Sequence, residues 1–224
     1  MILFIRVELL EKYDGGNNSF HLKRRFEQLS GEPCLLLNHT QITPELVQGL
    51  NPRAILMSGF GTSFQKFDIK TFWPLDDLIK HTDTPVLAFC GSHQLLGFLY
   101  NHNIKRIERL SDEPMRKLNV GEYDLGTNGY FMELGFYPVR IVKEDPLFDG
   151  LSNPFVVRQS HYCEVKTLPE DFELLASTDE CRIQAMKHRT KLIYSTQFHP
   201  EAYVDQYPDG KTILCSFFKI AGIL

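Results

Sequence analysis

Residues 85–96 read PVLAFCGSHQLL, and this stretch indicates how the chain folds. Its first five residues, 85–89, are mostly apolar and typical of a buried strand, and helix-like spacing begins directly after Cys90. The small residues Ala88, two positions before the cysteine, and Ser92, two positions after it, permit a sharp turn. Such a turn would raise the cysteine above the sheet at the positive end of a helix dipole, where a thiolate is favoured. The stretch predicts a nucleophile elbow; the plainer alternative is a buried cysteine at a strand end.

The segments before this stretch alternate short apolar runs with helix-like runs. The order strand, helix, strand predicts parallel strands, because parallel neighbours need crossover connections. We therefore expect an α/β fold, a three-layer sandwich in which helices cover both faces of a central, mostly parallel sheet. Strands are expected at 2–7, 34–37, 54–57 and 85–89, and a loop at 13–19. One helix is expected at 20–29, a second, short helix directly after Thr43 as its cap, and a third through residues 75–79.

Beyond about residue 117 the sequence becomes richer in strands and loops. We expect a small β-rich subregion there, followed by one last helix. No repeat, low-complexity tract or linker divides the sequence, so residues 1–224 are interpreted as one domain. The expected strands are 139–142, 155–157, 174–176, 183–186 and 192–198, and the last helix runs through 213–218.

The composition is that of an ordinary globular protein, with 43% hydrophobic and 23% charged residues. A net charge of -4 argues against nucleic acid as the partner, and the basic run 23–25 is interpreted as the solvated face of a helix. No apolar stretch approaches the roughly 20 residues that span a bilayer, and the start of the chain lacks the features of a signal peptide. No association with a membrane is therefore expected.

The five cysteines are scattered, at positions 34, 90, 163, 181 and 215. They form no C-x-x-C pair and no Cys/His cluster of the kind that binds zinc, so no metal is expected. Their odd number and their spread favour a reducing, cytoplasmic compartment over a disulfide framework. Most of them are expected to be small buried apolar residues.

A second constellation lies at 197–201, where the sequence reads QFHPE. An apolar strand again ends at polar residues, His199 and Glu201, which stand on either side of Pro200. A thiolate nucleophile needs a base for its proton and a third group that fixes the imidazole. The spacing lets both side chains emerge at one strand end; the plainer alternative is a surface His and Glu in a loop. A third and weaker element, 57–63, reads MSGFGTS and can aim N–H groups into a cleft.

Together these segments resemble the class I glutamine amidotransferases, the Cys-His-Glu group that includes the glutaminase domain of GMP synthetase. The elbow of that family reads G-[IV]-C-x-G-x-Q, against AFCGSHQ at 88–94. Its tail reads Q-[FW]-H-P-E, which 197–201 match fully. Further agreement lies at 144–151, 160–161 and 209–211, so the resemblance covers nearly the whole chain. It implies the flavodoxin-like fold of the family.

The resemblance implies a role for each matching residue. Cys90 would attack the side-chain amide of glutamine, His199 would carry the proton to the leaving amine, and Glu201 would orient His199. The N–H groups of Gly91 and Phe60 would stabilise the oxyanion. Water would then hydrolyse the γ-glutamyl thioester, and no cofactor is needed. The other implied substrate contacts are Gln94 for the glutamyl group, and the backbone of Ser160, Tyr162 and Cys163 for its α-carboxylate.

Several positions depart from the family pattern. Ala88 and Ser92 replace glycines, and both are small enough to be tolerated. Phe60 stands at the second glycine of an S-G-G-P turn and would be strained if its φ is positive. Tyr162 and Cys163 replace Gly and Asp, which bears on glutamine specificity more than on hydrolysis.

Three functions stay open on the sequence. The first is a glutaminase that passes ammonia to a separate synthase subunit, because the chain has no room for a synthetase domain. The second is a stand-alone γ-glutamyl hydrolase or peptidase that acts on a γ-glutamyl amide or conjugate. The third, a binding protein on a degenerate scaffold, is disfavoured by the intact Cys90, His199 and Glu201. Glu8, Asp14 and the segment 101–135 are considered for the mouth of the pocket, although no motif supports them.

Overall fold

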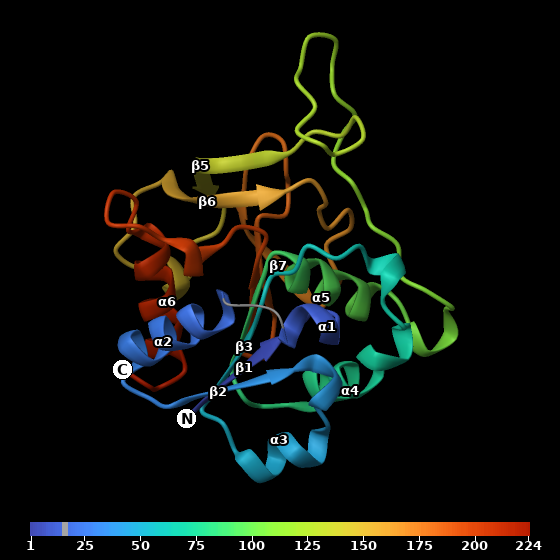
Figure 1. The fold of residues 1–224 in the computed structure, drawn as a ribbon. Coiled ribbons are helices and arrows are strands. Elements are labelled where there is room, and N and C mark those ends of the chain that lie inside the picture. The colour runs from blue at the N-terminus through green and yellow to red at the C-terminus, as the bar shows by residue number, and fades with distance from the viewer. Residues whose placement is uncertain (15–17) are drawn as a thin grey trace.

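The computed structural model describes residues 1–14 and 18–224, and a nine-stranded sheet lies at its centre (Figure 1). The strands follow one another in the order β2-β1-β3-β4-β9-β8-β7-β5-β6. They are β1 (Ile2–Arg6), β2 (Cys34–Asn38), β3 (Ala54–Met57), β4 (Val86–Phe89), β5 (Glu133–Ile141), β6 (Phe155–His161), β7 (Phe172–Ser177), β8 (Ala185–His188) and β9 (Ile193–Thr196). The α-helices of the described residues are α1 (Leu10–Asp14), α2 (Asn18–Ser30), α3 (Pro44–Leu50), α4 (Trp73–His81), α5 (Gly91–Asn101) and α6 (Asp209–Ile220).

The two halves of the sheet differ in strand direction. From β2 through β1, β3 and β4 to β9, each strand is parallel to its neighbour. From β9 through β8, β7 and β5 to β6, each strand is antiparallel to its neighbour. The predicted α/β class is confirmed, but the sheet is mixed and its antiparallel part is larger than a small subregion. The short connections between the later strands explain this, because short loops join antiparallel neighbours.

The strands of the parallel half are buried on both faces. Every residue of β1, β3, β4 and β9 is buried apart from the half-buried Arg6 at the end of β1. Successive side chains of a strand point to opposite faces. Accordingly, Leu3 and Ile5 belong to one apolar cluster, whereas Ile2 and Phe4 belong to another. Each face of the parallel half thus has its own core.

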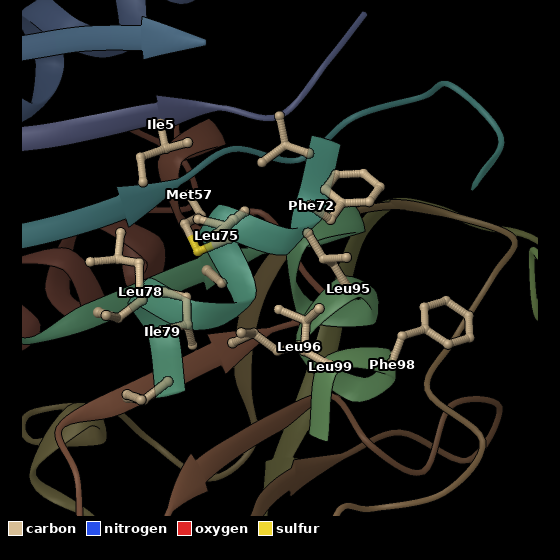
Figure 2. Packing of buried hydrophobic residues seen from close by; sticks show 14 of the residues in the cluster. Ile5, Met57, Phe72, Leu75, Leu78, Ile79, Leu95, Leu96, Phe98 and Leu99 are labelled. Carbon is tan, nitrogen blue, oxygen red and sulfur yellow. The ribbon is translucent and has the colours of Figure 1, made fainter. Parts of the chain in front are cut away.

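Helices cover both of these cores. Helices α4 and α5 contribute to the core on the first face, and Phe26 of α2 and Phe217 of α6 contribute to the core on the second. Burial of such side chains is the main favourable term in folding, at about 25 cal/mol per Å² of apolar surface. Figure 2 shows residues of the first core: Ile5, Met57, Phe72, Leu75, Leu78, Ile79, Leu95, Leu96, Phe98 and Leu99.

Helix α1 and strand β5 differ most from the predicted elements, and β6 and β8 end later than expected, at His161 and His188. Helix α1 ends at Asp14, within the loop expected at 13–19, and residues 15–17 of that loop lie outside the described residues. Strand β5 begins at Glu133, before the strand expected at 139–142. Its residues alternate irregularly between buried and exposed, so no apolar periodicity reveals them. Pairing with β6, which runs from Glu133 opposite His161 to Val139 opposite Phe155, holds this part of β5 in place.

The carboxyl ends of β1, β3, β4 and β9 lie side by side, because these strands are parallel neighbours. Ligands of open α/β sheets bind at such an edge.

The segment between α5 and β5 leaves the body of the molecule, as the yellow-green trace of Figure 1 shows. Among the described residues, no helix combines the length and the apolar character that a membrane crossing requires.

Candidate active site

Cys90 occupies a strained position between β4 and α5. Its φ is 45° and its ψ is -107°, and it is one of three described non-glycine residues with positive φ, with Asn51 and Asn128. A backbone of this kind costs on the order of 1–3 kcal/mol and persists where the surrounding structure imposes it. Here the Cys90 N–H donates to the carbonyl of Thr196 at the end of β9, at 2.7 Å. The predicted elbow is therefore the observed geometry.

His199 and Glu201 form a pair just after β9. The His199 N–H donates to the carbonyl of Arg158 at 2.9 Å, which ties this residue to β6. Pro200 then begins a short 3-10 turn, which brings the Glu201 carboxylate back to the imidazole. Oε1 of Glu201 lies 2.8 Å from Nδ1 of His199, and the carboxylate is almost fully buried. Both side chains thus emerge at one strand end, as the spacing predicts.

The charges around His199 favour its protonated form. Burial alone would lower the pKa of His199. The negative charges of Glu201 and Cys90, together with hydrogen bonds to both side chains, outweigh burial and hold this pKa well above the usual value. Since Nδ1 faces Glu201, Nε2 is the atom left for the cysteine sulfur. The arrangement suits an imidazolium that faces a thiolate.

Gly59 shows how closely these residues approach one another. A Cβ atom on Gly59 would lie 2.9 Å from Cε1 of His199 and 3.2 Å from Cβ of Cys90. A side chain at this position would therefore have to displace the imidazole. The glycine allows the turn after β3 to lie directly against the cysteine and the histidine.

One cavity of about 220 Å³ opens beside Cys90. Five of the six predicted substrate-contacting residues line it, and so does Cys90. Gly91 does not line it but lies under the Phe60 ring, where a Cβ atom would be 2.7 Å from Cδ1 of Phe60. The lining residues are Phe60, Gly61, Thr62, Ser63, Phe64, Cys90, Gln94, Asp112, Met132, Ser160, His161, Tyr162 and Cys163.

The turn that follows β3 is unstrained at Phe60. Since the described non-glycine residues with positive φ are Asn51, Cys90 and Asn128, the strain considered for Phe60 is absent. Neither the Phe60 N–H nor the Gly91 N–H donates a hydrogen bond to any described residue. Both donors are therefore available to a bound oxyanion.

Gln94 links the elbow to the opposite wall of the cavity. Its Nε2 donates to the carbonyl of Cys163 at 2.9 Å and to Oε1 of Gln197 at 3.2 Å. Nε2 of Gln197 in turn lies 3.7 Å from Sγ of Cys90. The Ser160 carbonyl lies 3.9 Å from the same sulfur. Two walls of the cavity thus meet at the cysteine through polar contacts.

Cys163 and His161 hold one wall of the cavity in place and show no sign of a catalytic role. Burial, followed by the charge of Asp112, raises the pKa of Cys163 to about 12, so this thiol stays protonated. Nδ1 of His161 lies 3.0 Å from the Cys163 carbonyl, and its Nε2 lies 2.9 Å from Oε2 of Glu133. The Glu133–His161 pair is buried and holds the loop that carries Tyr162 and Cys163.

The sequence motifs do not mark two of the residues that line the cavity. Asp112 and Met132 line the cavity and come from the segment 101–135, which no motif marks. Asp112 reaches the cavity because its segment pairs with the other wall, where Met115 N–H donates to the Tyr162 carbonyl at 2.8 Å. No local signal predicts this pairing, since it joins positions far apart in the chain. The described residues contain no group of three His, Cys, Asp or Glu side chains placed to hold a metal ion.

Known proteins match this chain over most of its length. The family described as "Glutamine amidotransferase class-I" matches residues 13–221. The glutamine-hydrolyzing GMP synthase subunit of Methanosphaera stadtmanae is 32% identical over 205 residues, which cover 92% of this chain and 93% of the relative. The protein of the same name from Methanocaldococcus jannaschii is 31% identical over 209 residues, which cover 93% of this chain and 95% of the relative.

Solved structures share the fold. The glutaminase domain of Trypanosoma brucei CTPS, with bound acivicin, superposes with a TM-score of 0.71 at 17% identity over 99% of this chain and 94% of that one. A glutamine amidotransferase from Thermotoga maritima superposes with a TM-score of 0.61 at 15% identity over 98% of this chain and 97% of that one. By its sequence match over nearly its whole length, the chain belongs to the class-I glutamine amidotransferase family.

Proposed function

We propose that this protein hydrolyses the side-chain amide of glutamine to glutamate and ammonia, and that a separate synthase subunit consumes the ammonia. The observation that carries the proposal is the position of Cys90, which lies at a strained elbow in a cavity next to the His199–Glu201 pair. The relatives named as glutamine-hydrolyzing subunits of GMP synthase support GMP synthesis as the pathway of the ammonia. In this account the present chain is the glutamine-hydrolysing subunit.

The first half of the reaction forms a thioester. The Cys90 thiolate attacks the amide carbon of glutamine, and the carbonyl electrons move to the oxygen. The N–H groups of Phe60 and Gly91 stabilise that oxyanion. The imidazolium of His199 then gives its proton to the amide nitrogen, which leaves as ammonia when the C–N bond breaks. Glu201 keeps the imidazole oriented throughout, through the 2.8 Å contact to Nδ1.

The second half releases glutamate. His199, now neutral, takes a proton from a water molecule as the water oxygen attacks the thioester carbon. A second oxyanion forms in the same place and is stabilised by the same N–H groups. Its collapse breaks the C–S bond, which frees glutamate and restores the thiolate of Cys90 beside the imidazolium of His199.

The cavity supplies separate contacts for the amino-acid end of glutamine. The backbone of Ser160, Tyr162 and Cys163 binds the α-carboxylate; the N–H groups of Tyr162 and Cys163 donate to no other described residue. Asp112 binds the α-ammonium. It is the one Asp, Glu, Lys or Arg among the described residues that line the cavity. The Phe64 N–H donates to Oδ1 of Asp112 at 2.8 Å, which fixes the carboxylate in place.

The assignment of Asp112 also accounts for a departure from the family pattern. Cys163 stands where the family has an aspartate, and its buried thiol stays uncharged. Asp112 lies close enough to Cys163 for its charge to raise the pKa of that thiol. A carboxylate is thus present at this wall of the cavity, although it comes from another part of the chain.

The other two functions that the sequence leaves open receive less support. The relatives are named for glutamine hydrolysis, which favours glutamine over a γ-glutamyl conjugate as the substrate. The assembled Cys90, His199 and Glu201 argue against a degenerate scaffold. All five cysteines are free, which supports a reducing, cytoplasmic compartment.

The proposal is tested by measuring ammonia and glutamate from L-glutamine and from a panel of γ-glutamyl amides, with Cys90→Ala as the control. We expect release of both products in equal amounts from glutamine, and no release by the variant. Hydrolysis of the amides without hydrolysis of glutamine would replace the proposal with the γ-glutamyl hydrolase.

A further inference from the structure

We propose that Arg6 and Ser92 lock the turn after β3, so that the Phe60 N–H faces Cys90 before any partner binds. The inference rests on the proposed hydrolysis of glutamine and adds two positioning residues to it. Neither residue touches the reacting atoms in this account. Both act through the backbone of Ser58, Gly59 and Phe60, which forms one side of the oxyanion site.

Arg6 fixes the direction of the Gly59–Phe60 peptide. Nη1 of Arg6 donates to the Gly59 carbonyl at 3.2 Å. In a trans peptide the carbonyl and the following N–H point in opposite directions, and the cis bond found in the described residues lies elsewhere, before Pro154. The Phe60 N–H therefore points away from Arg6.

The order of the strands shows toward which residue the Phe60 N–H points. Strand β3 lies between β1 and β4. Arg6 is the last residue of β1, Gly59 follows the end of β3, and Cys90 follows the end of β4. Arg6 and Cys90 are thus on opposite sides of the turn. An N–H that points away from Arg6 points toward the cysteine, where the oxyanion forms.

Ser92 fixes the preceding peptide from the other side. Its Oγ donates to the Ser58 carbonyl at 2.6 Å, and both residues are buried. The Val7 N–H donates to Oγ of Ser58 at 3.0 Å, which adds a third tether. Successive carbonyls of extended backbone point to opposite sides. This alternation is observed here: the Ser58 carbonyl points toward α5, and the Gly59 carbonyl points toward β1.

The charges near Arg6 hold its guanidinium in place. Burial lowers the pKa of Arg6, and the carboxylates of Glu8 and Glu201 oppose that effect. An arginine keeps its charge under these conditions. The guanidinium therefore stays attracted to two carboxylates while it donates to the Gly59 carbonyl. Ser92 stands where the family pattern has glycine, which has no hydroxyl to offer the turn.

The consequence is a glutaminase whose oxyanion site is preset in the isolated protein. The ring of Phe60 covers Gly91, so the turn after β3 lies directly against the elbow that carries Cys90. A preset site stabilises the tetrahedral state without reorganisation during the reaction. The free protein is therefore expected to hydrolyse glutamine without a second protein to organise the turn after β3.

The test compares Arg6→Met, Arg6→Lys and Ser92→Gly in the isolated protein. Loss of an oxyanion donor lowers kcat by about 100-fold or more. We expect this loss in Arg6→Met with a KM within about twofold of the wild type, partial recovery in Arg6→Lys, and a loss of about tenfold in Ser92→Gly. Ser30→Ala is the matched control, because Ser30 donates its hydroxyl to the Phe26 carbonyl at 2.7 Å in α2, and it should leave kcat unchanged.

Binding of glutamate γ-semialdehyde gives a second readout. Its thiohemiacetal on Cys90 carries an oxyanion, so the isolated wild type should bind it about 100-fold or more tighter than glutamine. Arg6→Met should lose this preference and still bind glutamine. If Arg6→Met left both kcat and the preference for the semialdehyde unchanged, the proposal that Arg6 and Ser92 lock the turn would be overturned. A wild type that binds glutamine and releases no ammonia would also overturn it. A wild type that fails to bind glutamine would overturn the proposed function itself.

Discussion

Nδ1 of His199 lies 2.8 Å from Oε1 of Glu201, although only Pro200 separates the two residues in the chain. The short turn that begins at the proline folds the carboxylate back onto the imidazole. This contact sets the tautomer of His199, because it engages Nδ1 and leaves Nε2 for the sulfur. It also supplies the negative charge that holds the pKa of His199 well above its usual value. The transfer of a proton from His199 to the departing ammonia therefore depends on the contact between His199 and Glu201.

Glu201→Gln is expected to shift the pH dependence of hydrolysis. The wild type keeps His199 protonated to a higher pH than an ordinary histidine, because the pKa is raised. As pH rises through that pKa, the general acid is lost and kcat/KM falls. Without the carboxylate the pKa of His199 falls, so the alkaline limb of kcat/KM should move to lower pH. A profile of kcat/KM against pH checks this, and an unmoved alkaline limb would contradict the assigned role of Glu201.

Gly59→Ala is expected to disable the site without unfolding the protein. The new methyl group would lie 2.9 Å from Cε1 of His199, which must then move away from Cys90. Since misplacement by about 1 Å can cost about 100-fold in rate, kcat should fall by at least that factor. Gly49→Ala is the control, because a Cβ atom there meets nothing within 4 Å. The two variants should give similar circular dichroism spectra, and equal activity would show that the close approach at Gly59 is unimportant.

The motifs predicted the elbow and the His-Glu pair because each is local. Cys90 follows its strand directly, and His199 and Glu201 lie within one short turn, so spacing alone brings them to the sheet edge. The fold class follows from the alternation of strands and helices for the same reason. The extent of the antiparallel half does not follow from the sequence, because the first residues of β5 show no apolar periodicity.

The rest of the site depends on contacts between distant segments. Asp112 reaches the cavity through pairing with the strand end near Tyr162, and Arg6 reaches the Gly59 carbonyl across two neighbouring strands. No spacing in the sequence encodes either contact. The motif marks Ser92 only as a small residue that the elbow tolerates, whereas its hydroxyl donates to the Ser58 carbonyl.

Asp112→Asn is expected to weaken recognition of the α-ammonium. The asparagine keeps an oxygen for the Phe64 N–H, so the loop should hold its shape. Loss of the charge should raise KM for glutamine about tenfold with little change in kcat. The monoamide of glutaric acid, which lacks the amino group, should show no such change. An equal loss on both compounds would indicate that Asp112 supports only the structure of the loop.

Cys90→Gly is expected to be more stable than Cys90→Ala. Both variants lose the sulfur, but only glycine adopts a φ of 45° and ψ of -107° without strain. The difference in the free energy of unfolding should be about 1–2 kcal/mol. Urea denaturation of the two variants measures it. Equal stability would mean that the elbow is unstrained in solution.

The proposed mechanism requires that Cys90 forms a thioester with the glutamyl group. The most direct measurement is mass spectrometry of protein that has been incubated with glutamine and quenched in acid, followed by mapping of the cysteine peptides. We expect a γ-glutamyl adduct on the peptide that contains Cys90 and none on the peptides of the other cysteines. Glutamate production without an adduct on Cys90, or continued production by Cys90→Ala, would contradict it.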